Sequence, residues 1–403
     1  MPHYSLGTIY ITKKTHQYID QVLQTKRLSY GPFCKKFEID FAKLHHSKEG
    51  IVCSSGTNAL RVIFEALKIK HQWPNNSEVL VPATTFVASI NAIVHSNLKP
   101  VLVDVEEDSF NINPRLIEAK ISKKTKAIMP VHLFGKPSKM SAIDKISKKH
   151  NLIIVEDCCE TIASHHQKKS VGSWGVAGAF STNSAHILAT GIGGVITTSD
   201  SELAILMRSL INHGRSSHYL SIDDDDNIKS PSSFNQLVDS RFIFPHIGFS
   251  FRLSELEAAV GLVQLEDIKI LIEKRVKNVL YLNKNLTHLK KWLALLKQDK
   301  NNSHVYMAYP LVLTAQAHKI QPDCLKNLIY FLESKNIETR PLMPIINQPA
   351  YKKFKFKETD FPVSSYLLKS GFYIGCHQDL TMKELDYFIQ AITSFFDNLN
   401  KKQ

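Results

Sequence analysis

The six cysteines of this chain are too few and too scattered to form a disulfide framework or a metal cluster. No two of them have C-x-x-C spacing, and only Cys158 and Cys159 are adjacent. This pattern indicates reduced thiols in a cytosolic protein. The two adjacent cysteines are expected to point to opposite faces of a strand, which makes a poor chelate. We therefore predict no metal site and no iron–sulfur cluster.

Long hydrophobic runs are also absent from the sequence. No apolar stretch reaches the roughly 18 residues that a membrane span requires, and the N-terminus has no basic segment followed by an apolar one. There is no internal repeat, and no low-complexity tract beyond the acidic run at 223–226. The sequence thus predicts neither secretion nor membrane insertion, and the expected location is the cytoplasm.

Positive charge is abundant, with 50 lysines and arginines against 37 acidic residues and a formal net charge of +13. Nucleic-acid-binding proteins share such an excess. Here, however, the lysines are spread along the chain without an aromatic-interleaved cluster or a recognisable nucleic-acid-binding module. We expect no nucleic-acid partner. A basic cleft would equally attract an anionic ligand such as a nucleotide diphosphate sugar.

Short runs rich in valine and isoleucine alternate with helical patterns in the first half of the chain. The predicted strands are 100–105, 126–132 and 152–156, with helices between them at 114–121 and 141–150. This alternation favours a parallel sheet with helices on its faces. Ligands bind such sheets at the carboxyl ends of the strands, and Asp157 follows one of those ends.

The second half of the chain has longer elements. The sequence predicts a helix at 201–212, an insertion loop at 216–246 and one long amphipathic helix at 255–289. Strands at 305–313 and 337–340 and helices at 323–334 and 382–398 then suggest a small α+β domain.

With 403 residues, 43% of them hydrophobic, the chain can bury a core of about two domains. We predict an N-terminal arm (1–30), a large α/β domain (31–255) and a linker helix with a smaller α+β domain (256–403).

Two segments have the composition of a phosphate-binding site. At Ser55-Gly56-Thr57 a strand breaks directly before an apolar helix, so free backbone N–H groups and a hydroxyl stand at the positive helix end. Between 177 and 198 two strands flank hydroxyl-bearing residues, His186 and a glycine cluster that lets backbone approach a ligand. Plainer interpretations remain open: a serine N-cap at the first segment and an inert polar loop at the second.

In their order along the chain, these segments resemble the DegT/StrS-type sugar aminotransferases, a pyridoxal phosphate (PLP) family of fold type I. The stretch 178–194 is similar to the family's SFxxxKxLxxGEGG loop, and Ser-Gly-Thr-Asn-Ala-Leu at 55–60 to its SGTxAL motif. Further likenesses are to VxVPxxTFxA at 79–88, EDxxQ at 156–160, GYNxRL at 248–253 and GIxTRP at 336–341. The resemblance runs from about 31 to 397. It implies a large domain with a mostly parallel sheet, a smaller C-terminal α+β domain, and a homodimer with active sites at the subunit boundary.

The family's Schiff-base lysine corresponds to His186, and no lysine lies between Ser170 and Asp200. Imidazole forms no stable imine with an aldehyde, so a bound cofactor would not be covalently tethered there. A neutral imidazole, which titrates near pH ~6.5, is a competent general base. Within the family, histidine at this place resembles the small branch of nucleotide-sugar 3-dehydratases, such as GDP-4-keto-6-deoxymannose 3-dehydratase.

The resemblance also implies roles for other residues. Asp157 would pair with the pyridinium nitrogen, Phe86 would stack on the ring unless it is a core residue, and Ser250 replaces the asparagine that reaches the phosphate of the neighbouring subunit. Arg340 would hold a carboxylate bidentately or make only a surface ion pair. The implied cofactor contacts are Gly56, Thr57, Phe86, Asp157, Glu160, Ser181 and Ser250. The implied substrate contacts are His213, Arg215 and Arg340.

The implied reaction is C3 dehydration of a nucleotide-activated 4-keto-6-deoxysugar. It would start from pyridoxamine phosphate (PMP), with His186 as the base and L-glutamate restoring PMP. Two alternatives remain: a glutamate-dependent sugar 4-aminotransferase, and a catalytically silent PLP-fold protein with a regulatory role. The departures from the family pattern at His186, Ile192 and Ser250 are consistent with the silent protein.

Overall fold

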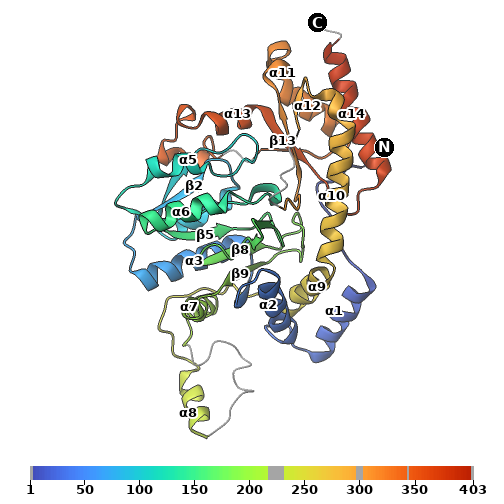
Figure 1. Cartoon of the computed structure of the whole chain (residues 1–403). Coiled ribbons are helices and arrows are strands. Elements are labelled where there is room, and N and C mark those ends of the chain that lie inside the picture. The colour runs from blue at the N-terminus through green and yellow to red at the C-terminus, as the bar shows by residue number, and fades with distance from the viewer. Residues whose placement is uncertain (1–2, 217–230, 296–302, 343–344, 401–403) are drawn as a thin grey trace.

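The computed structural model describes residues 3–216, 231–295, 303–342 and 345–400. It contains a seven-stranded sheet flanked by helices and a four-stranded sheet with its own helices (Figure 1). The large sheet has the order β1-β9-β8-β5-β4-β2-β3. Its strands are β1 (Glu49–Cys53), β2 (Glu78–Pro82), β3 (Lys99–Val103), β4 (Thr125–Ile128), β5 (Ile153–Asp157), β8 (Ala177–Ser181) and β9 (Gly194–Thr198).

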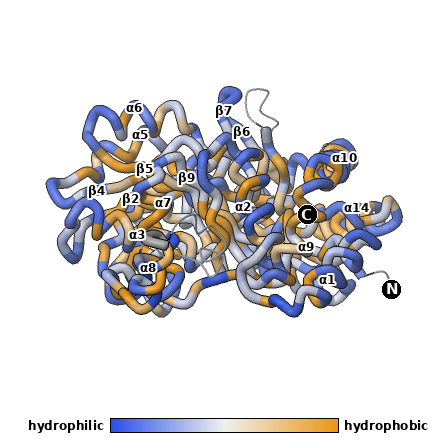
Figure 2. The backbone as a smooth tube through the Cα atoms, turned by 90° about the horizontal axis from the view of Figure 1, so that it is seen from below, coloured by the Kyte–Doolittle hydropathy of each residue, from blue (hydrophilic) through white to orange (hydrophobic). Residues whose placement is uncertain are grey.

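The pairing of this sheet is mostly parallel, as predicted. Strands β3, β2, β4, β5 and β8 pair in parallel, whereas β9 is antiparallel to both β8 and β1. The carboxyl ends of the parallel strands therefore meet at one edge of the sheet. Figure 2 shows that apolar positions concentrate in the inner segments, as expected for strands covered on both faces.

Both faces of the large sheet are covered by helices. In β2, Val79 and Val81 pack in the core cluster that contains α3 and α4, whereas Leu80 packs with Ile143 of α6 on the other side. These helices are α2 (Pro32–Leu44), α3 (Gly56–His71), α4 (Val87–His95), α5 (Pro114–Ile117), α6 (Met140–His150) and α7 (Ser201–Ile211). The predicted strand and helix alternation is thus confirmed.

Two predictions were wrong, and both concern the part of the chain between residues 216 and 289. The expected loop at 216–246 contains a helix, α8 (Pro231–Ser240), because Phe234, Leu237 and Val238 recur at helical spacing; the acidic run at 223–226 lies outside the described residues. The expected long helix at 255–289 is two helices, α9 (Glu255–Glu266) and α10 (Ile268–Asn285), which break at Asp267. Helix α9 contacts α1 (Lys13–Thr25) and α2, whereas α10 contacts α14 (Met382–Asn400), so the break redirects the chain between these two sets of helices.

The four-stranded sheet is antiparallel and belongs to the C-terminal part. Its strands, in spatial order, are β10 (Leu293–Ala294), β11 (Tyr309–Leu313), β13 (Gly371–Ile374) and β12 (Arg340–Pro341). The helices around it are α11 (Ala315–Ile320), α12 (Cys324–Glu333), α13 (Pro362–Ser370) and α14 (Met382–Asn400). The strand predicted at 305–313 begins only at Tyr309. Residues 305–308 form a turn that hydrogen-bonds to Phe134 and Gly135 of the large domain.

The N-terminal segment is anchored to the C-terminal part rather than projecting freely. Tyr4 is fully buried, forms a parallel bridge with Ile337 and donates its hydroxyl to the carbonyl of Gly375. Helix α1 (Lys13–Thr25) then packs against α9. No helix in the described part of the chain is long and apolar enough to cross a membrane.

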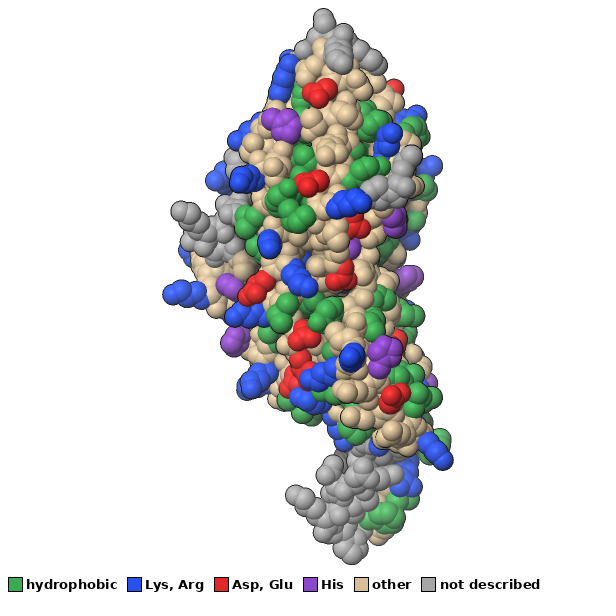
Figure 3. Space-filling view, turned by 90° about the vertical axis from the view of Figure 1, so that its right-hand side faces the viewer, with side chains coloured by type: hydrophobic (Ala, Val, Ile, Leu, Met, Phe, Trp, Pro, Cys, Tyr) green, Lys and Arg blue, Asp and Glu red, His purple; other side chains and the backbone are tan. Residues whose placement is uncertain are grey.

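Charges are mixed on the face of the molecule shown in Figure 3. Lysine and arginine side chains there are interspersed with acidic and apolar side chains. On that face the positive excess forms no continuous patch of the kind that nucleic-acid-binding surfaces present.

Candidate functional site

A cavity of about 260 Å³ opens at the carboxyl-terminal edge of the large sheet. Its wall combines the start of α3, the start of α4, the turn after β5 and the loop between β8 and β9. Met307 and Tyr373 close it from the side of the C-terminal domain. The lining residues are Ser55, Gly56, Thr57, Phe86, Ala88, Cys159, Glu160, Ser181, Asn183, Ala185, His186, Ile192, Gly193, Met307 and Tyr373.

One end of the cavity is the N-terminus of α3, a helix of 16 residues. Ser55 is its N-cap and accepts a hydrogen bond from the backbone N–H of Asn58. A Cβ atom on Gly56 would lie 2.6 Å from Cys159 Sγ and 2.8 Å from Ser181 Cβ, so only glycine fits at this contact. The helix thus presents its partial positive charge and free N–H groups to the cavity, as an anion site requires. The predicted contacts Gly56, Thr57 and Ser181 lie together here.

Asp157 lies just behind this wall at the end of β5 and is 3% exposed. Its carboxylate accepts hydrogen bonds from Ser89 Oγ at 2.7 Å and from the N–H of Cys159 at 3.1 Å. Neither donor is charged, and no described lysine or arginine forms a salt bridge with it. These two uncharged donors hold the carboxylate in place, where a cationic group of a ligand could pair with it.

Phe86 precedes α4 and lines the cavity with 56% of its surface exposed. The alternative interpretation of this residue as a core phenylalanine is wrong, because core aromatic residues of this chain such as Phe64 are fully buried. An exposed ring at a cavity wall leaves a face free for an aromatic ligand.

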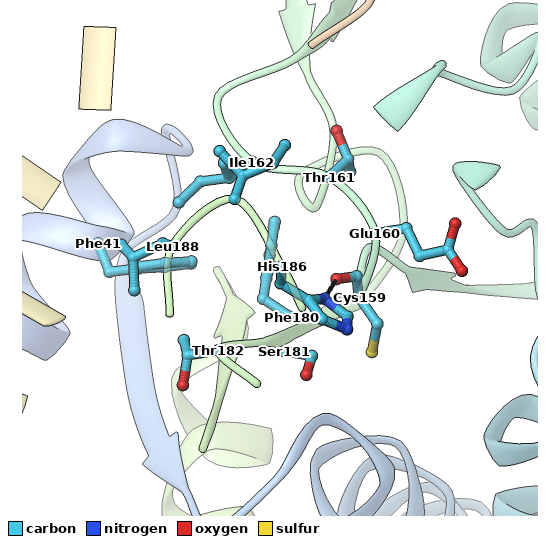
Figure 4. Close-up of a pocket in the computed structure, with 11 residues that line it drawn as sticks. Phe41, Cys159, Glu160, Thr161, Ile162, Phe180, Ser181, Thr182, His186 and Leu188 are labelled. Carbon is cyan, nitrogen blue, oxygen red and sulfur yellow. Dashed lines mark hydrogen bonds between the residues drawn. The ribbon is translucent and has the colours of Figure 1, made fainter. Parts of the chain in front are cut away.

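His186 lies in the loop between β8 and β9 and is half-buried. Its Nδ1 hydrogen-bonds the backbone carbonyl of Cys159, drawn as a dashed line in Figure 4. A carbonyl oxygen can only accept, so Nδ1 carries the proton and Nε2 of the neutral ring has a free lone pair. Loss of solvation lowers the pKa of His186, although the carbonyl and Asp157 oppose this effect. His186 therefore lies in the cavity wall, and the unprotonated nitrogen of its neutral form is available to a ligand.

Glu160, in the turn after β5, is 6% exposed and lines the same cavity. The backbone N–H of Phe134 donates to its Oε2 at 2.7 Å. Burial raises the pKa of Glu160 to about 8, and the negative charge of Asp157 adds to the shift. At neutral pH this carboxyl is therefore mostly protonated and can donate a hydrogen bond.

We expect Glu160 to make the stability of the protein fall as the pH rises. The pKa is raised from 4.5 in the unfolded chain to about 8 in the folded one, so between these values only the unfolded state releases the proton. Glu160→Gln keeps the acceptor for Phe134 but does not titrate. By calorimetry without added cofactor, the variant should match the wild type near pH 5 and melt about 2 °C or more above it at pH 8. The control variant Glu107→Gln, which changes an exposed carboxyl, should have the melting temperature of the wild type at both pH values. If the carboxyl of Glu160 were ionised in the folded protein, Glu160→Gln would also melt at the wild-type temperature at both pH values, which would contradict the prediction.

The sequence matches the model of the DegT/DnrJ/EryC1/StrS aminotransferase family over residues 10–393. The chain belongs to this family. It is 30% identical over 394 residues to the GDP-perosamine synthase of Caulobacter vibrioides, covering 97% of this chain and 98% of the relative. It is 27% identical over 398 residues to the GDP-4-keto-6-deoxy-D-mannose 3-dehydratase of Escherichia coli O55:H7, with 97% and 100% coverage.

Among solved structures, E. coli GDP-4-keto-6-deoxy-D-mannose 3-dehydratase with bound hydrated PLP superposes with a TM-score of 0.84 at 26% identity, covering 97% of this chain and 99% of that one. The fold is therefore that of the fold type I PLP enzymes, as predicted.

Several residues that the family pattern suggested do not line the cavity. Ser250 is exposed and accepts a hydrogen bond from Arg252 at 2.9 Å, and His213 lies 3.4 Å from the same guanidinium. Arg215 donates to the carbonyl of Arg241 at 2.5 Å and lies over the ring of Phe244. Within one chain these side chains lie apart from the cavity, so the structure does not bring them to the predicted contacts.

Arg340 is placed at the rim of the cavity. It pairs in register with Tyr373 across β12 and β13, and Tyr373 lines the cavity. Directly opposite residues of an antiparallel pair project from the same face. The exposed guanidinium donates to the carbonyl of Thr339 at 2.7 Å, which leaves its other N–H groups for a ligand.

Sequence reasoning missed Cys159, Met307 and Tyr373. Cys159 follows the motif aspartate by two positions, and the structure corrects its predicted placement: β5 ends at Asp157, so both adjacent cysteines lie in the turn. Met307 and Tyr373 come from the other domain, and no pattern in the family motifs pointed to them.

His132, Glu156 and Cys158 form a buried group with metal-ligand atoms close together. His132 Nδ1 accepts from the N–H of Ser138 at 3.0 Å, so its Nε2 donates to Glu156 at 3.2 Å. The carboxylate of Glu156 also accepts backbone N–H groups from Gly172, Trp174 and Gly175. Its lone pairs are used by protein donors, which indicates a structural network that anchors the 172–175 turn to β5.

Proposed function

We propose that this protein is a PLP/PMP-dependent enzyme that removes the 3-hydroxyl of a nucleotide-activated 4-keto-6-deoxysugar, with His186 as the base. The observation that carries the proposal is the wall of the cavity. It presents an imidazole with a free Nε2 where the family has a lysine, and no lysine is among the described residues that line it.

The residues around the cavity fit a pyridoxal-type cofactor. Gly56, Thr57 and Ser181 at the α3 N-terminus would hold the phosphate, Asp157 the ring nitrogen, and Phe86 a face of the ring. The close approach of Gly56 to Cys159 and Ser181 supports this fit, since it packs the N-terminus of α3 against two other segments that line the same cavity. When bound, PMP supplies an amino group for condensation with the sugar ketone and a ring that takes up electrons.

His186 performs the proton transfer in this proposal. The Cys159 carbonyl fixes the tautomer, so Nε2 accepts a proton from the cavity and can return it to a departing hydroxyl. The lowered pKa of His186 keeps the ring neutral and ready to act as a base. Because no amine is among the described residues of the wall, none of these residues would compete with PMP for the ketone.

Glu160 and Arg340 would complete the site. Glu160 is protonated near neutral pH and so offers a hydrogen-bond donor beside the ring. Arg340 at the rim would bind the carboxylate of L-glutamate when PMP is restored. The overall reaction balances: the sugar loses its 3-oxygen as water, hydrolysis consumes one water, and ammonia is released. The oxidation of glutamate to 2-oxoglutarate supplies the two electrons that reduce the sugar.

A glutamate-dependent sugar 4-aminotransferase is the second candidate. It is favoured by the GDP-perosamine synthase of C. vibrioides, which is slightly more similar in sequence than the E. coli 3-dehydratase. In that reaction the amino group stays on the sugar. His186 would then only move protons.

The two functions differ in the mass of the sugar product. Incubation of PMP-loaded protein with L-glutamate and GDP- or dTDP-4-keto-6-deoxysugars, followed by mass spectrometry, should show a product that has lost one oxygen. A product that has gained an amino group and kept all its hydroxyls would establish the aminotransferase instead.

We also propose that the protein is a homodimer. Helix α8 and the segment after it expose large apolar side chains, including Phe242 at 85% and Ile247 at 97%, next to Ser250 and His213. Exposed apolar groups of this kind mark an interface, and a second subunit there would bring Ser250 to the cofactor phosphate.

Removal of these apolar side chains should weaken the dimer. Light scattering after size-exclusion chromatography is expected to show a wild-type dimer, and the double variant Phe242→Ser, Ile247→Ser should shift toward monomer and lose PMP affinity. The control Ile39→Ser removes an apolar side chain that is 66% exposed on α2 and should stay dimeric. A wild-type monomer with full cofactor affinity would contradict the proposal.

A further inference from the structure

Tyr373, on β13, brings to the cavity a hydroxyl group that no described residue uses. The residue is half-buried and lines the cavity, and no described group forms a hydrogen bond with its hydroxyl. Two other tyrosines show the usual pairing: Tyr366 donates to the carbonyl of Leu313 at 2.6 Å, and Tyr351 donates to Asn91 Oδ1 at 2.8 Å. The oxygen of Tyr373 is not enclosed by protein, so a ligand can reach it. A ligand that takes water away from this hydroxyl must hydrogen-bond to it or lose affinity.

The ring of Tyr373 is held in place by both domains. Strand β13 lies between β11 and β12, and Tyr373 is in register with Pro310 on one side and with Arg340 on the other. Its ring packs against the ring of Phe134 in the large domain, with 5.0 Å between the centroids. A tyrosine side chain has only two torsions to fix, and these contacts already restrict them. A ligand that binds the hydroxyl therefore loses little free energy in ordering it.

The phenol of Tyr373 keeps its proton near neutral pH. Burial raises the pKa of Tyr373 to about 12; the charge of Glu160, when ionised, adds to this shift, and the positive charge of Arg340 opposes it. Tyr373 is thus an uncharged group in a cavity that also contains the carboxyl of Glu160 and has a guanidinium at its rim. Its hydroxyl can donate one hydrogen bond and accept others.

The position of Tyr373 favours a contact with the substrate rather than with the cofactor. The proposed cofactor contacts Gly56, Asp157 and Phe86 all belong to the large domain. Among the described lining residues, the C-terminal domain contributes Met307 and Tyr373, and Tyr373 is the one with a hydroxyl. A carboxylate such as that of L-glutamate is matched better by a guanidinium. An uncharged hydroxyl suits the uncharged oxygens of a sugar.

We propose that Tyr373 is a substrate-binding residue: its hydroxyl hydrogen-bonds to an uncharged oxygen of the sugar in the cavity and so distinguishes the nucleotide sugar from the nucleotide alone. This inference rests on the proposed function, in which the cavity takes up a nucleotide-activated sugar. It adds a contact from the C-terminal domain that orients the sugar against the wall containing His186. A site that holds a hydrogen-bonding group for a substrate oxygen discriminates against ligands without that oxygen.

The test is the affinity of PMP-loaded protein for GDP- and dTDP-6-deoxysugars with a hydroxyl at C4, measured by isothermal titration calorimetry. Without a ketone these ligands cannot condense with PMP, so only binding is observed. Tyr373→Phe keeps the ring contact with Phe134 and removes the hydroxyl. It should weaken binding of the nucleotide sugar about 3- to 10-fold and leave the affinities for PMP and for free GDP or dTDP unchanged. Tyr330→Phe, which changes a tyrosine 62% exposed on α12 and outside the cavity, should bind every ligand like the wild type.

Thermal unfolding without ligands separates a ligand contact from a structural one. Because the hydroxyl of Tyr373 has no protein partner, Tyr373→Phe should melt within about 1 °C of the wild type. Tyr366→Phe removes the donor to the Leu313 carbonyl and should melt about 2 °C or more below the wild type. A loss in Tyr373→Phe as large as that in Tyr366→Phe would overturn the proposal, and this result needs no bound ligand.

Equal affinity of the wild type and Tyr373→Phe for the nucleotide sugars would also overturn the inference. So would a loss of affinity that free GDP or dTDP shares, because the hydroxyl would then contact the nucleotide. An aminotransferase would show the expected loss of sugar affinity just as a dehydratase would, so the inference can hold where the proposed reaction fails. Wild-type protein that binds none of these nucleotide sugars would contradict the proposed substrate class, and this inference with it.

Discussion

His186→Asn is expected to lower the rate of sugar dehydration by about 10²- to 10⁴-fold, the usual contribution of a positioned general base. Asparagine fills a similar space and can still donate to the Cys159 carbonyl, so the loop should keep its conformation. It has no lone pair basic enough to accept the proton. The rate of loss of the sugar oxygen in PMP-loaded protein measures the effect.

Affinity for PMP should be nearly unchanged in this variant, because the phosphate and ring contacts come from other residues. The matched control is His46→Asn: His46 is exposed, and its backbone has φ +53°, which asparagine tolerates. This control should retain the wild-type rate. Dehydration within tenfold of the wild type in His186→Asn would show that another group is the base.

His186→Lys is expected to capture PLP covalently at residue 186. The new amine would stand where the family has its lysine, and partial burial lowers the pKa of a lysine so that it becomes nucleophilic. After borohydride reduction and proteolysis, mass spectrometry should find a permanent adduct on the peptide that contains residue 186 in most chains. The wild-type peptide should have none.

The variant His186→Lys tests where residue 186 lies relative to the bound cofactor, and not whether His186 acts as a base. Asn183→Lys places an amine elsewhere on the same wall and should give far less adduct, since only residue 186 is expected beside the aldehyde carbon. Absence of the adduct from folded, PLP-bound His186→Lys protein would mean that the loop does not face the reactive end of the cofactor. In that case His186 could not act as the base at the reactive end of the cofactor, and its proposed role would be wrong.

Much of the fold is encoded locally and was predicted from the sequence. The β-branched runs of β3, β4 and β5 bury both faces, and the break at Ser55-Gly56-Thr57 starts α3 because Ser55 caps it. The same local signals placed Gly56, Thr57, Ser181 and His186 in one cavity. Motifs that end strands and begin helices at one sheet edge must meet there.

Other features depend on contacts between distant segments and could not be predicted. The tautomer of His186 is set by a backbone carbonyl at residue 159, which carries no sequence signal. Arg275 lies within the helix predicted at 255–289 and is buried only because α10 meets the 305–308 turn, a contact that the sequence does not reveal. The break at Asp267 likewise follows from the path between two domains rather than from a helix-breaking residue.

The central claim, dehydration by a lysine-free site, is tested most directly by the fate of the glutamate nitrogen. Protein with PMP, ¹⁵N-labelled L-glutamate and a GDP- or dTDP-linked 4-keto-6-deoxysugar is allowed to turn over, and the label is followed in sugar and ammonium. The account predicts ¹⁵N in ammonium, and a sugar that has lost one oxygen and contains no ¹⁵N. A ¹⁵N-labelled amino sugar would contradict it in favour of transamination. Unchanged glutamate and sugar with every nucleotide tried would indicate a catalytically silent protein.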